Sequence, residues 1–466
     1  MAAAFFFRAC LVPHRSYVFN DEYEHVAIAK NLRESGRFSR CEFYLDDRCL
    51  SSYLPQWVPG FHFLLARTTE VFGTGLEGAY EFNAAVGALG VGAVFLTAYL
   101  AAGDATAALA AALLLCFFPL HLKFSGSASP DGLALLSVTL SLAAALAAAR
   151  LRTARSMGLF LAAAGWALLV RPESGLAVVF QGALLARRSP RCGFLGWGPL
   201  LVLLLPGLLY LPHIAAFDVE TYGSGGSVPG RLLLLRGLRF WLDGRSVPAA
   251  VVLLAALGWH RASREDLVPD WWWPAYFLSF LFLYSFINRG DISQGDFQRF
   301  NLQLCLPVLL LAGMGCRAAL RAAREMRRGR AAVGVGLAAL LASHALGVPY
   351  IYADTVEPRW RQERESLLAA AAGLDPACVF VAYSPSTVIA VLDRPSVNIS
   401  YAMDEAVLSR ELRGRCLVLV RDHACRQDRR GLCAALDRKF RLQAVAAPLY
   451  LLRPRTAAAE PRRRTP

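Results

Sequence analysis

The hydrophobic positions of this chain gather in long runs from residue 78 to residue 352, with polar residues confined to short segments between them. A helix needs ~20 mostly apolar residues to cross a bilayer, so these runs predict membrane spans. The spans are predicted at 78–101, 105–122, 130–149, 157–186, 194–213, 247–260, 271–287, 299–316 and 331–352. An earlier run, Ala2–Val12, contains Arg8 and is too short for an ordinary span.

The run 157–186 is interrupted in its middle by Arg171-Pro172-Glu173. Proline removes a backbone donor, and two charges at mid-span are costly in lipid. We therefore expect two short helices in a hairpin whose polar tip stays on one side of the membrane. With this hairpin, the arginine clusters that follow 130–149, 157–186 and 247–260 and precede 331–352 all lie on one side, which is then cytoplasmic.

The C-terminal part changes character from Asp354 onward, where short β-type runs alternate with helical patterns. Strands are predicted at Val379–Ala382, Ser396–Ile399, Leu417–Val420 and Ala444–Leu452, and helices at Asp404–Leu412 and Asp428–Phe440. The expected organisation is a transmembrane domain over 1–353, a small extracytoplasmic α/β domain over 354–452, and a basic, disordered tail over 453–466.

Composition agrees with a membrane protein, because 56% of the 466 residues are hydrophobic and only 18% are charged. The formal net charge of +14 comes from arginine clusters between the apolar runs, and such clusters are typical of the cytoplasmic loops of membrane proteins. The charge therefore does not indicate a nucleic-acid partner.

Six of the eleven cysteines lie in segments that face outward in this topology. They are Cys41, Cys49, Cys378, Cys416, Cys425 and Cys433. An even number of cysteines in an oxidising compartment permits disulfides, and Cys41 with Cys49 is the expected pair because it closes a short loop. Free thiols are the alternative, and zinc is disfavoured because no paired Cys-x-x-Cys occurs.

Residues 20–38 place Asp21, Glu22, Glu24 and His25 within one and a half helical turns, just after the first hydrophobic run. Titratable groups clustered beside a membrane indicate a functional site. An outward-facing carboxylate pair suits a transfer reaction in which a base takes a proton from an acceptor hydroxyl or amine. Asp21, Glu22 and His25 share one helical face, which leaves a divalent cation as an alternative to a polar helix surface.

Short motifs follow one another between residues 21 and 307. They are Asp21-Glu22 with Ala27 and Asn31-Leu32, Gly36-Arg37-Phe38, Tyr53-Leu54-Pro55, Pro59-Gly60, Ser129-Pro130-Asp131, Leu169-Val170-Arg171-Pro172-Glu173, and Arg299-Phe300 leading into Leu306-Pro307. In this order they resemble C-superfamily glycosyltransferases of the protein mannosyltransferase and aminoarabinose-transferase type. The resemblance implies a mainly α, polytopic membrane protein with about 10–12 transmembrane helices.

The resemblance also implies a polyprenyl-phosphate-linked sugar donor, an active site at the outer membrane face and inversion at the anomeric carbon. It makes Asp21 the expected general base, with Glu22 orienting the acceptor, whereas Glu24 and His25 are expected to be solvated. The alternative for Asp21 is an N-cap role at the start of a helix over 22–34. Membrane lipids are the other expected partner, and the acceptor and the sugar stay unspecified.

A leaving lipid phosphate needs positive charge where negative charge develops. Arg299 is the first choice for this role, with an interfacial snorkelling arginine as the alternative. Arg171, Lys123 and Arg289 follow, although Arg171 beside Glu173 also suits a structural ion pair. Asp131 completes the expected substrate-binding set, unless it caps the span that begins there.

A transporter or flippase of lipid-linked glycans is the main rival class. Such proteins often carry internal repeats and charges at mid-bilayer. This chain has no convincing repeat, and its candidate charges gather toward the outer face, which favours the enzyme. A non-catalytic membrane scaffold would leave the carboxylate cluster without a role.

Overall fold

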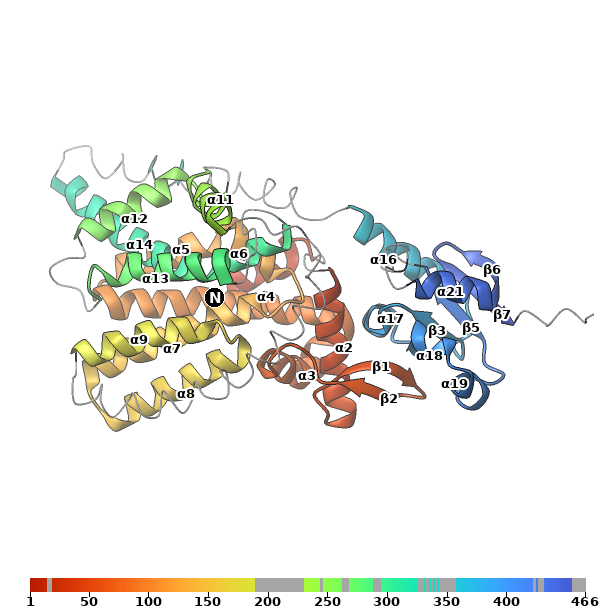
Figure 1. Ribbon diagram of the computed structural model, residues 1–466. Coiled ribbons are helices and arrows are strands. Elements are labelled where there is room, and N and C mark those ends of the chain that lie inside the picture. The colour runs from red at the N-terminus through yellow and green to blue at the C-terminus, as the bar shows by residue number, and fades with distance from the viewer. Residues whose placement is uncertain are drawn as a thin grey trace, which may run out of the picture. The chain divides into compact units, whose positions relative to one another are not determined.

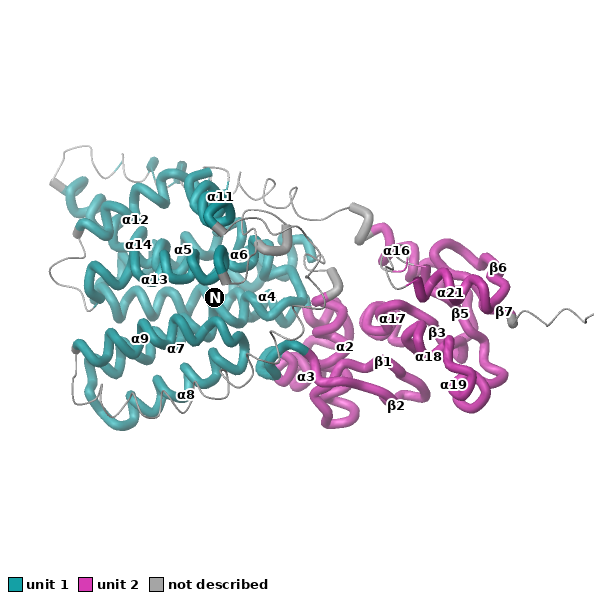
Figure 2. The backbone as a smooth tube through the Cα atoms, viewed as in Figure 1, with its two compact units in different colours: residues 1–18, 56–61, 80–356 teal, residues 19–55, 62–79, 357–466 magenta. Residues whose placement is uncertain are grey.

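The protein is described by a computed structural model that covers residues 1–14, 19–188, 230–243, 246–261, 268–287, 295–325, 358–421 and 431–454, with single positions between some of these ranges. The chain divides into two compact units, shown in different colours in Figure 2. The helical unit comprises residues 1–18, 56–61 and 80–356, and the α/β unit comprises residues 19–55, 62–79 and 357–466.

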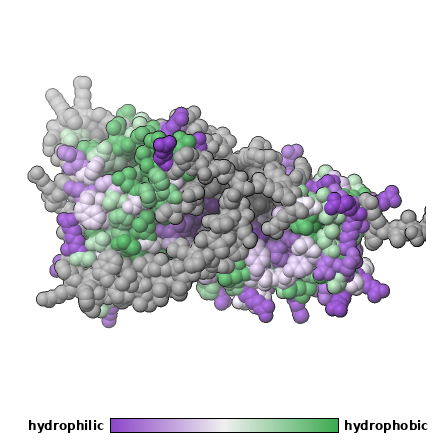
Figure 3. All heavy atoms as spheres, viewed as in Figure 1, coloured by the Kyte–Doolittle hydropathy of each residue, from purple (hydrophilic) through white to green (hydrophobic). Residues whose placement is uncertain are grey.

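The helical unit packs helices around a large apolar core (Figure 1). Its elements are α1 (Ala2–Phe6), η1 (Phe7–Leu11), α4 (Gly75–Ala102), α5 (Ala105–Cys116), α6 (Pro119–Ser125), α7 (Asp131–Leu151), α8 (Ala154–Val170), α9 (Ser174–Arg188), α11 (Gly230–Leu242), α12 (Ala249–Arg261), α13 (Trp272–Phe282), η2 (Leu283–Ile287), η3 (Gly295–Phe300) and α14 (Asn301–Glu325). On the face seen in Figure 3, hydrophobic side chains form green patches over part of this unit. Exposed members include Leu253, Trp259, Leu278 and Phe282.

Within the described residues, three segments are long and apolar enough to cross a membrane, namely Gly75–Ala102, Asp131–Leu151 and Gln298–Arg324. The pair α5 and α6 makes a fourth candidate span, bent by 60°. This pair corresponds to the span predicted over 105–122, and its break lies just before Pro119, the first residue of α6. The predicted span 194–213 and most of 331–352 lie outside the described residues, so the total of 10–12 spans stays a prediction.

The predicted helical hairpin is confirmed. α8 ends at Val170 and α9 begins at Ser174, so Arg171-Pro172-Glu173 forms the turn between them. Gly60 lies against the end of α8, where an added Cβ would come within 2.5 Å of the Leu169 carbonyl oxygen. The glycine of the Pro59-Gly60 motif therefore permits a close approach of two backbones.

The short N-terminal helix is anchored by Arg8, which is fully buried. Its guanidinium donates hydrogen bonds to the Cys116 carbonyl oxygen (3.1 Å), His121 Nδ1 (2.9 Å) and Ser125 Oγ (3.2 Å). Because these three acceptors lie on either side of the break between α5 and α6, Arg8 holds the bend from both ends.

The α/β unit contains one seven-stranded mixed sheet with the order β2-β1-β4-β3-β5-β7-β6. Its elements are α2 (Phe19–Ser35), β1 (Arg40–Leu45), β2 (Arg48–Tyr53), α3 (Gly60–Phe72), α16 (Pro358–Ala371), β3 (Val379–Ala382), α17 (Pro385–Leu392), β4 (Ser396–Asn398), α18 (Ile399–Met403), α19 (Glu405–Arg410), β5 (Leu417–Val420), α21 (Leu432–Lys439), β6 (Phe440–Ala446) and β7 (Leu449–Pro454). The three central strands β4, β3 and β5 are parallel, and the remaining pairs are antiparallel.

The hairpin of β1 and β2 joins this sheet although it lies more than 300 residues before β4 in the chain. Phe43 pairs with Val397 and Tyr44 pairs with Ser396. The early cysteine loop is therefore an integral part of the C-terminal sheet, and the 19–55 segment belongs to the same compact unit as residues 357–466.

The predicted Cys41–Cys49 disulfide is confirmed, with the two sulfur atoms 2.07 Å apart. The other four outward cysteines pair as Cys378–Cys416 and Cys425–Cys433. All three bonds belong to the α/β unit. Free thiols, among the described residues, are Cys10, Cys116, Cys305 and Cys316.

The strands predicted at Val379–Ala382 and Leu417–Val420 are confirmed with the same bounds as β3 and β5. The single strand predicted over Ala444–Leu452 is wrong, because the chain turns at Ala447 and Pro448 and returns as β7. Proline lacks the backbone N–H that a continuous ladder requires.

Candidate functional site

The acidic stretch of the sequence forms the beginning of α2. This helix starts at Phe19, so Asp21 lies inside its first turn, and the N-cap interpretation of Asp21 is wrong. A carboxylate in the first turn is still favoured by the helix dipole. Asp21 is partly exposed, whereas Glu22 is fully buried.

The expectation that Glu24 and His25 are solvated is also wrong, since their exposed fractions are 6% and 1%. Glu24 is covered because Arg40 of β1 pairs with it, Nη1 to Oε1 at 2.7 Å. His25 is covered because its Nδ1 lies 2.8 Å from Nε2 of His62 on α3. Both partners come from later segments of the chain, which the helical pattern of residues 20–38 does not reveal.

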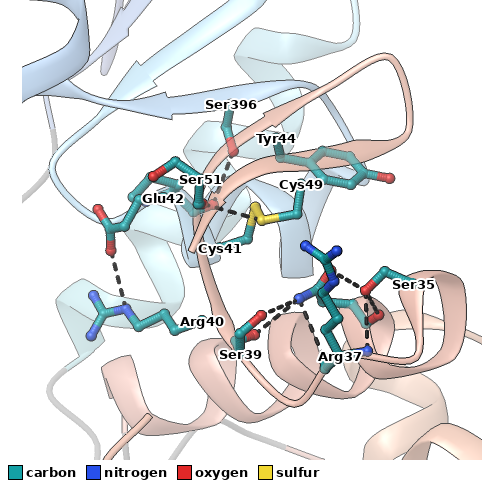
Figure 4. Close-up of a disulfide and its surroundings, with 12 residues drawn as sticks. Ser35, Arg37, Ser39, Arg40, Cys41, Glu42, Tyr44, Cys49, Ser51 and Ser396 are labelled. Atoms are coloured by element: carbon teal, nitrogen blue, oxygen red, sulfur yellow. Dashed lines mark hydrogen bonds and ion pairs between the residues drawn. A yellow bond between two sulfur atoms is a disulfide. The ribbon is translucent and has the colours of Figure 1, made fainter. Parts of the chain in front are cut away.

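Arg40 is the centre of a partly buried polar cluster. Its Nε lies 3.4 Å from Glu42 Oε1, and its guanidinium lies over the ring of Tyr53 at 5.4 Å. Figure 4 shows Arg40 and Glu42 turned toward each other beside the Cys41–Cys49 bond. Burial raises the pKa of Glu24 to about 7, although Arg40 acts in the opposite direction. Burial likewise raises the pKa of Glu42, which Arg40 again opposes.

A divalent cation was the alternative for Asp21, Glu22 and His25. In the part of the chain that the structure describes, no three His, Cys, Asp or Glu side chains gather closely enough to hold a metal ion. The His25 ring instead contacts the His62 ring, and the His62 ring contacts Phe38.

The helical unit holds a second polar cluster, around η3. Arg171 Nη2 lies 2.9 Å from Asp131 Oδ1, and Arg171 Nη1 lies 3.5 Å from Glu173 Oε1. The predicted ion pair of Arg171 with Glu173 is thus confirmed, and Asp131 provides a closer partner. The capping interpretation of Asp131 is wrong, because Pro130 is the N-cap of α7 and the carboxylate faces Arg171.

Phe300 at the end of η3 connects two of the arginines. The guanidinium carbons of Arg171 and Arg299 lie 5.5 Å and 5.3 Å from the centre of its ring, and the ring of Tyr284 stacks on it at 4.5 Å. A cation over an aromatic face is attracted by the ring quadrupole. One aromatic side chain therefore holds Arg171 and Arg299 in the same region.

Lys123 reaches the same turn from α6. It is fully buried, and its Nζ donates a hydrogen bond to Oε1 of Gln298, the residue before Arg299 (3.0 Å). The structure thus brings Lys123, Asp131, Arg171 and Arg299 to one cluster at η3, which we call the η3 cluster. Arg289, the remaining predicted member, lies outside the described residues.

Several polar residues around these clusters were not predicted. Gln298 pairs with Lys123, and Asn83 of α4 donates hydrogen bonds to the carbonyl oxygens of Ser127 and Ser129. Asn83 thereby fixes the turn that leads into Asp131. A buried amide inside an otherwise apolar run is the signal that marks Asn83 in the sequence.

Comparisons with known proteins find a family match over part of this chain and a shared fold over most of it. Residues 55–215 match the family model described as dolichyl-phosphate-mannose-protein mannosyltransferase. A search of curated protein sequences finds no match.

Among solved structures, ArnT from Cupriavidus metallidurans has the same fold. Its complex with undecaprenyl phosphate aligns with a TM-score of 0.61 at 16% identity, covering 97% of this chain and 96% of that chain. The apo form gives a TM-score of 0.60 at 15% identity, with the same coverage.

The archaeal oligosaccharyltransferase AglB from Archaeoglobus fulgidus, in complex with an inhibitory peptide and a dolichol-phosphate, aligns with a TM-score of 0.53 at 13% identity. It covers 90% of this chain and 68% of that chain. Residues 55–215 thus match the mannosyltransferase family model, and the chain as a whole shares its fold with ArnT and AglB.

Proposed function

We propose that this protein transfers a sugar from a polyprenyl-phosphate-linked donor to an acceptor at the extracytoplasmic face of the membrane, with inversion at the anomeric carbon. The observation that carries the proposal is the η3 cluster, which gathers Lys123, Arg171 and Arg299 in a fold that ArnT shares in complex with undecaprenyl phosphate. Its three cations outnumber its one carboxylate, Asp131, even when the neighbouring carboxylate of Glu173 is added.

In the proposed reaction, Asp21 takes the proton from the hydroxyl or amine of the acceptor. The acceptor atom forms a bond to the anomeric carbon while the bond from that carbon to the phosphate oxygen breaks. Its electrons go to the polyprenyl phosphate, which leaves with one additional negative charge. Glu22 orients the acceptor, and positioning together with charge stabilisation provides most of the rate.

Arg299 is the proposed main contact of the leaving phosphate, since a guanidinium can donate two parallel hydrogen bonds to phosphate oxygens. Lys123 and Arg171 add positive charge in the same cluster. Arg171 also forms ion pairs with Asp131 and Glu173, so we expect it to contribute less than Arg299 to binding the phosphate. Arg289 keeps its proposed substrate-binding role from the sequence.

The disulfides support the extracytoplasmic side. All three lie in the α/β unit, which also contains Asp21. Disulfides form and persist in oxidising compartments. The arginine clusters between the apolar runs, which favour the cytoplasmic side, give the same orientation independently.

The base assignment is tested with membranes that carry wild-type protein, Asp21→Asn or the matched control Asp46→Asn. Each is assayed with a panel of polyprenyl-phosphate-linked hexoses and pentoses labelled in the sugar. Loss of a general base is expected to lower transfer by about 100-fold or more in Asp21→Asn, with little change in Asp46→Asn. Full activity of Asp21→Asn would remove this residue from the base role.

The phosphate contact is tested with Arg299→Gln in the same assay. We expect a lower kcat, because the developing charge on the leaving phosphate loses a contact that strengthens in the transition state. A change in KM alone would assign Arg299 to donor binding without transition-state stabilisation. The anomeric configuration of the product, measured by NMR, tests inversion directly.

A further inference from the structure

The proposed reaction uses Asp21 and Glu22 but leaves their neighbours Glu24 and Arg40 without a role. Glu24 lies one helical turn after Asp21, so the two side chains share a face of α2. Glu24 is buried and pairs with Arg40 at 2.7 Å. Arg40 also pairs with Glu42 at 3.4 Å and covers the ring of Tyr53.

Asp21 is electrostatically linked to the same two residues. Its carboxylate interacts with the Arg40 guanidinium and repels the Glu24 carboxylate. A single cation thus faces two carboxylates from α2 and one from its own strand. An anchored cation of this kind restricts the orientation of the helical turn that carries those carboxylates.

We propose that Arg40 is a positioning residue for Asp21, which fixes the first turn of α2 on β1 and balances the charge of its acidic face. The inference rests on the proposed function, because it matters for transfer only if Asp21 is the base. The positioning itself is a property of the free protein and is testable without donor or acceptor.

The strand that carries Arg40 is held rigidly. Cys41, the next residue, is bonded to Cys49 across the hairpin, and β1 pairs with β4 of the central sheet (Figure 4). A register fixed by a sheet determines which side chains face a given side. Arg40 therefore occupies a fixed position against α2, as a group that orients a catalytic carboxylate must.

The charges that face Glu24 are Arg40 and Glu42 on β1 and Asp21 on α2. Tyr53 on β2 lies in the same cluster, but burial and the nearby carboxylates raise its pKa and keep it neutral. Because burial raises the pKa of Glu24 to about 7, this carboxyl exchanges its proton near neutral pH. Once ionised, Glu24 pairs more strongly with Arg40 and holds the first turn of α2 more firmly on β1. Removing Arg40 takes away the stabilising cation, so the ionisation of Glu24 moves to higher pH.

The test measures hydrogen–deuterium exchange of full-length protein in detergent, from about pH 5 to about pH 9, as protection factors for the first turn of α2. Wild-type protein is expected to show a step in protection near pH 7. Arg40→Met should lower the protection factors there by about tenfold and move the step to higher pH. Arg40→Lys should show a smaller loss of protection and a smaller shift of the step, because it keeps a positive charge. Glu24→Gln should abolish the step.

Arg415→Met is the matched control. Arg415 pairs bidentately with Asp46 in the same unit but touches neither Glu24 nor Arg40. It should leave the first turn of α2 unchanged. If Arg40→Met does not fold, Glu24→Gln, which keeps the shape of the side chain, provides the second variant that tests the proposal.

Unchanged protection and an unchanged step in Arg40→Met would overturn the proposal, as would a step near pH 7 that persists in Glu24→Gln. Transfer measured on these variants and on Asp21→Asn separates the two proposals. Lower protection in Arg40→Met together with full transfer activity in Asp21→Asn would contradict the base assignment and leave the positioning intact.

Discussion

Arg171 and Asp131 join the tip of a helical hairpin to the first residue of a membrane-spanning helix, with Nη2 and Oδ1 2.9 Å apart. The Asp131 side chain is only 2% exposed, and that of Arg171 is 11% exposed. The pair thereby fixes the turn between α8 and α9 against α7 and holds Arg171 near Phe300.

Breaking this pair from one side is expected to destabilise the protein. Arg171→Gln leaves the buried Asp131 carboxylate without its closest cation, at a cost of about 3–5 kcal/mol. Thermal unfolding in detergent should show the loss, and the double variant Arg171→Gln/Asp131→Asn should recover part of it. Glu173→Gln is the control, since its more exposed pair is worth at most about 1 kcal/mol. Equal losses in Arg171→Gln and Glu173→Gln would contradict this assignment.

The disulfides are expected to differ in their contribution to stability. The two cysteines of the Cys378–Cys416 bond are 38 residues apart in the sequence, whereas those of the Cys41–Cys49 bond are 8 apart. In the chain-entropy model, removing the long bridge costs about 4 kcal/mol and removing the short one about 2.5 kcal/mol. The free energies of unfolding of Cys378→Ala/Cys416→Ala and Cys41→Ala/Cys49→Ala check which bond contributes more. A larger loss from the short bridge would show that native contacts at the hairpin, rather than loop closure, dominate.

Two glycines set the contact between α12 and α14. An added Cβ at Gly258 would come within 1.9 Å of the Leu311 carbonyl oxygen, and one at Gly315 within 1.9 Å of the Leu254 carbonyl oxygen. Gly258→Ala or Gly315→Ala is therefore expected to force the helices apart and lower the melting temperature. Gly158 of α8 has open space around its Cβ position, so Gly158→Ala should be neutral or stabilising. Tolerance of alanine at both crossing positions would contradict the close approach.

The stability of the α/β unit should depend on pH through Glu24. Its pKa is about 7 in the folded protein and ~4.3 in an unfolded chain. Between these values the folded state holds a proton that the unfolded state has lost, so the free energy of unfolding falls as pH rises and levels off above about 7. Glu24→Gln should flatten this dependence. An unchanged slope in that variant would assign the pH dependence to another group.

Local sequence patterns predicted those elements that are determined by residues close together in the sequence. Arg171-Pro172-Glu173 marked the hairpin because a proline and two charges cannot continue an apolar helix. The strands at 379–382 and 417–420 are short apolar runs bounded by breakers, and the structure has them with the same bounds. The Cys41–Cys49 bond followed from a short spacing.

The features that depend on distant partners were not predictable in the same way. Nothing in residues 40–53 indicates that Tyr44 pairs with Ser396, because strand pairing across a long separation leaves no local pattern. Glu24 and His25 read as solvated for the same reason, since Arg40 and His62 cover them from other elements. The η3 cluster was predicted residue by residue, but its organisation around Phe300 and Gln298 required the fold.

The central claim is the transfer of a sugar from a polyprenyl-phosphate donor, and the release of polyprenyl phosphate tests it most directly. Proteoliposomes with the full-length protein are supplied with doubly labelled donors and with acceptors from a membrane extract. We predict that polyprenyl phosphate appears in step with sugar transfer and that both fail in Asp21→Asn. Movement of intact donor across the bilayer without any release of polyprenyl phosphate would contradict the account and indicate a flippase.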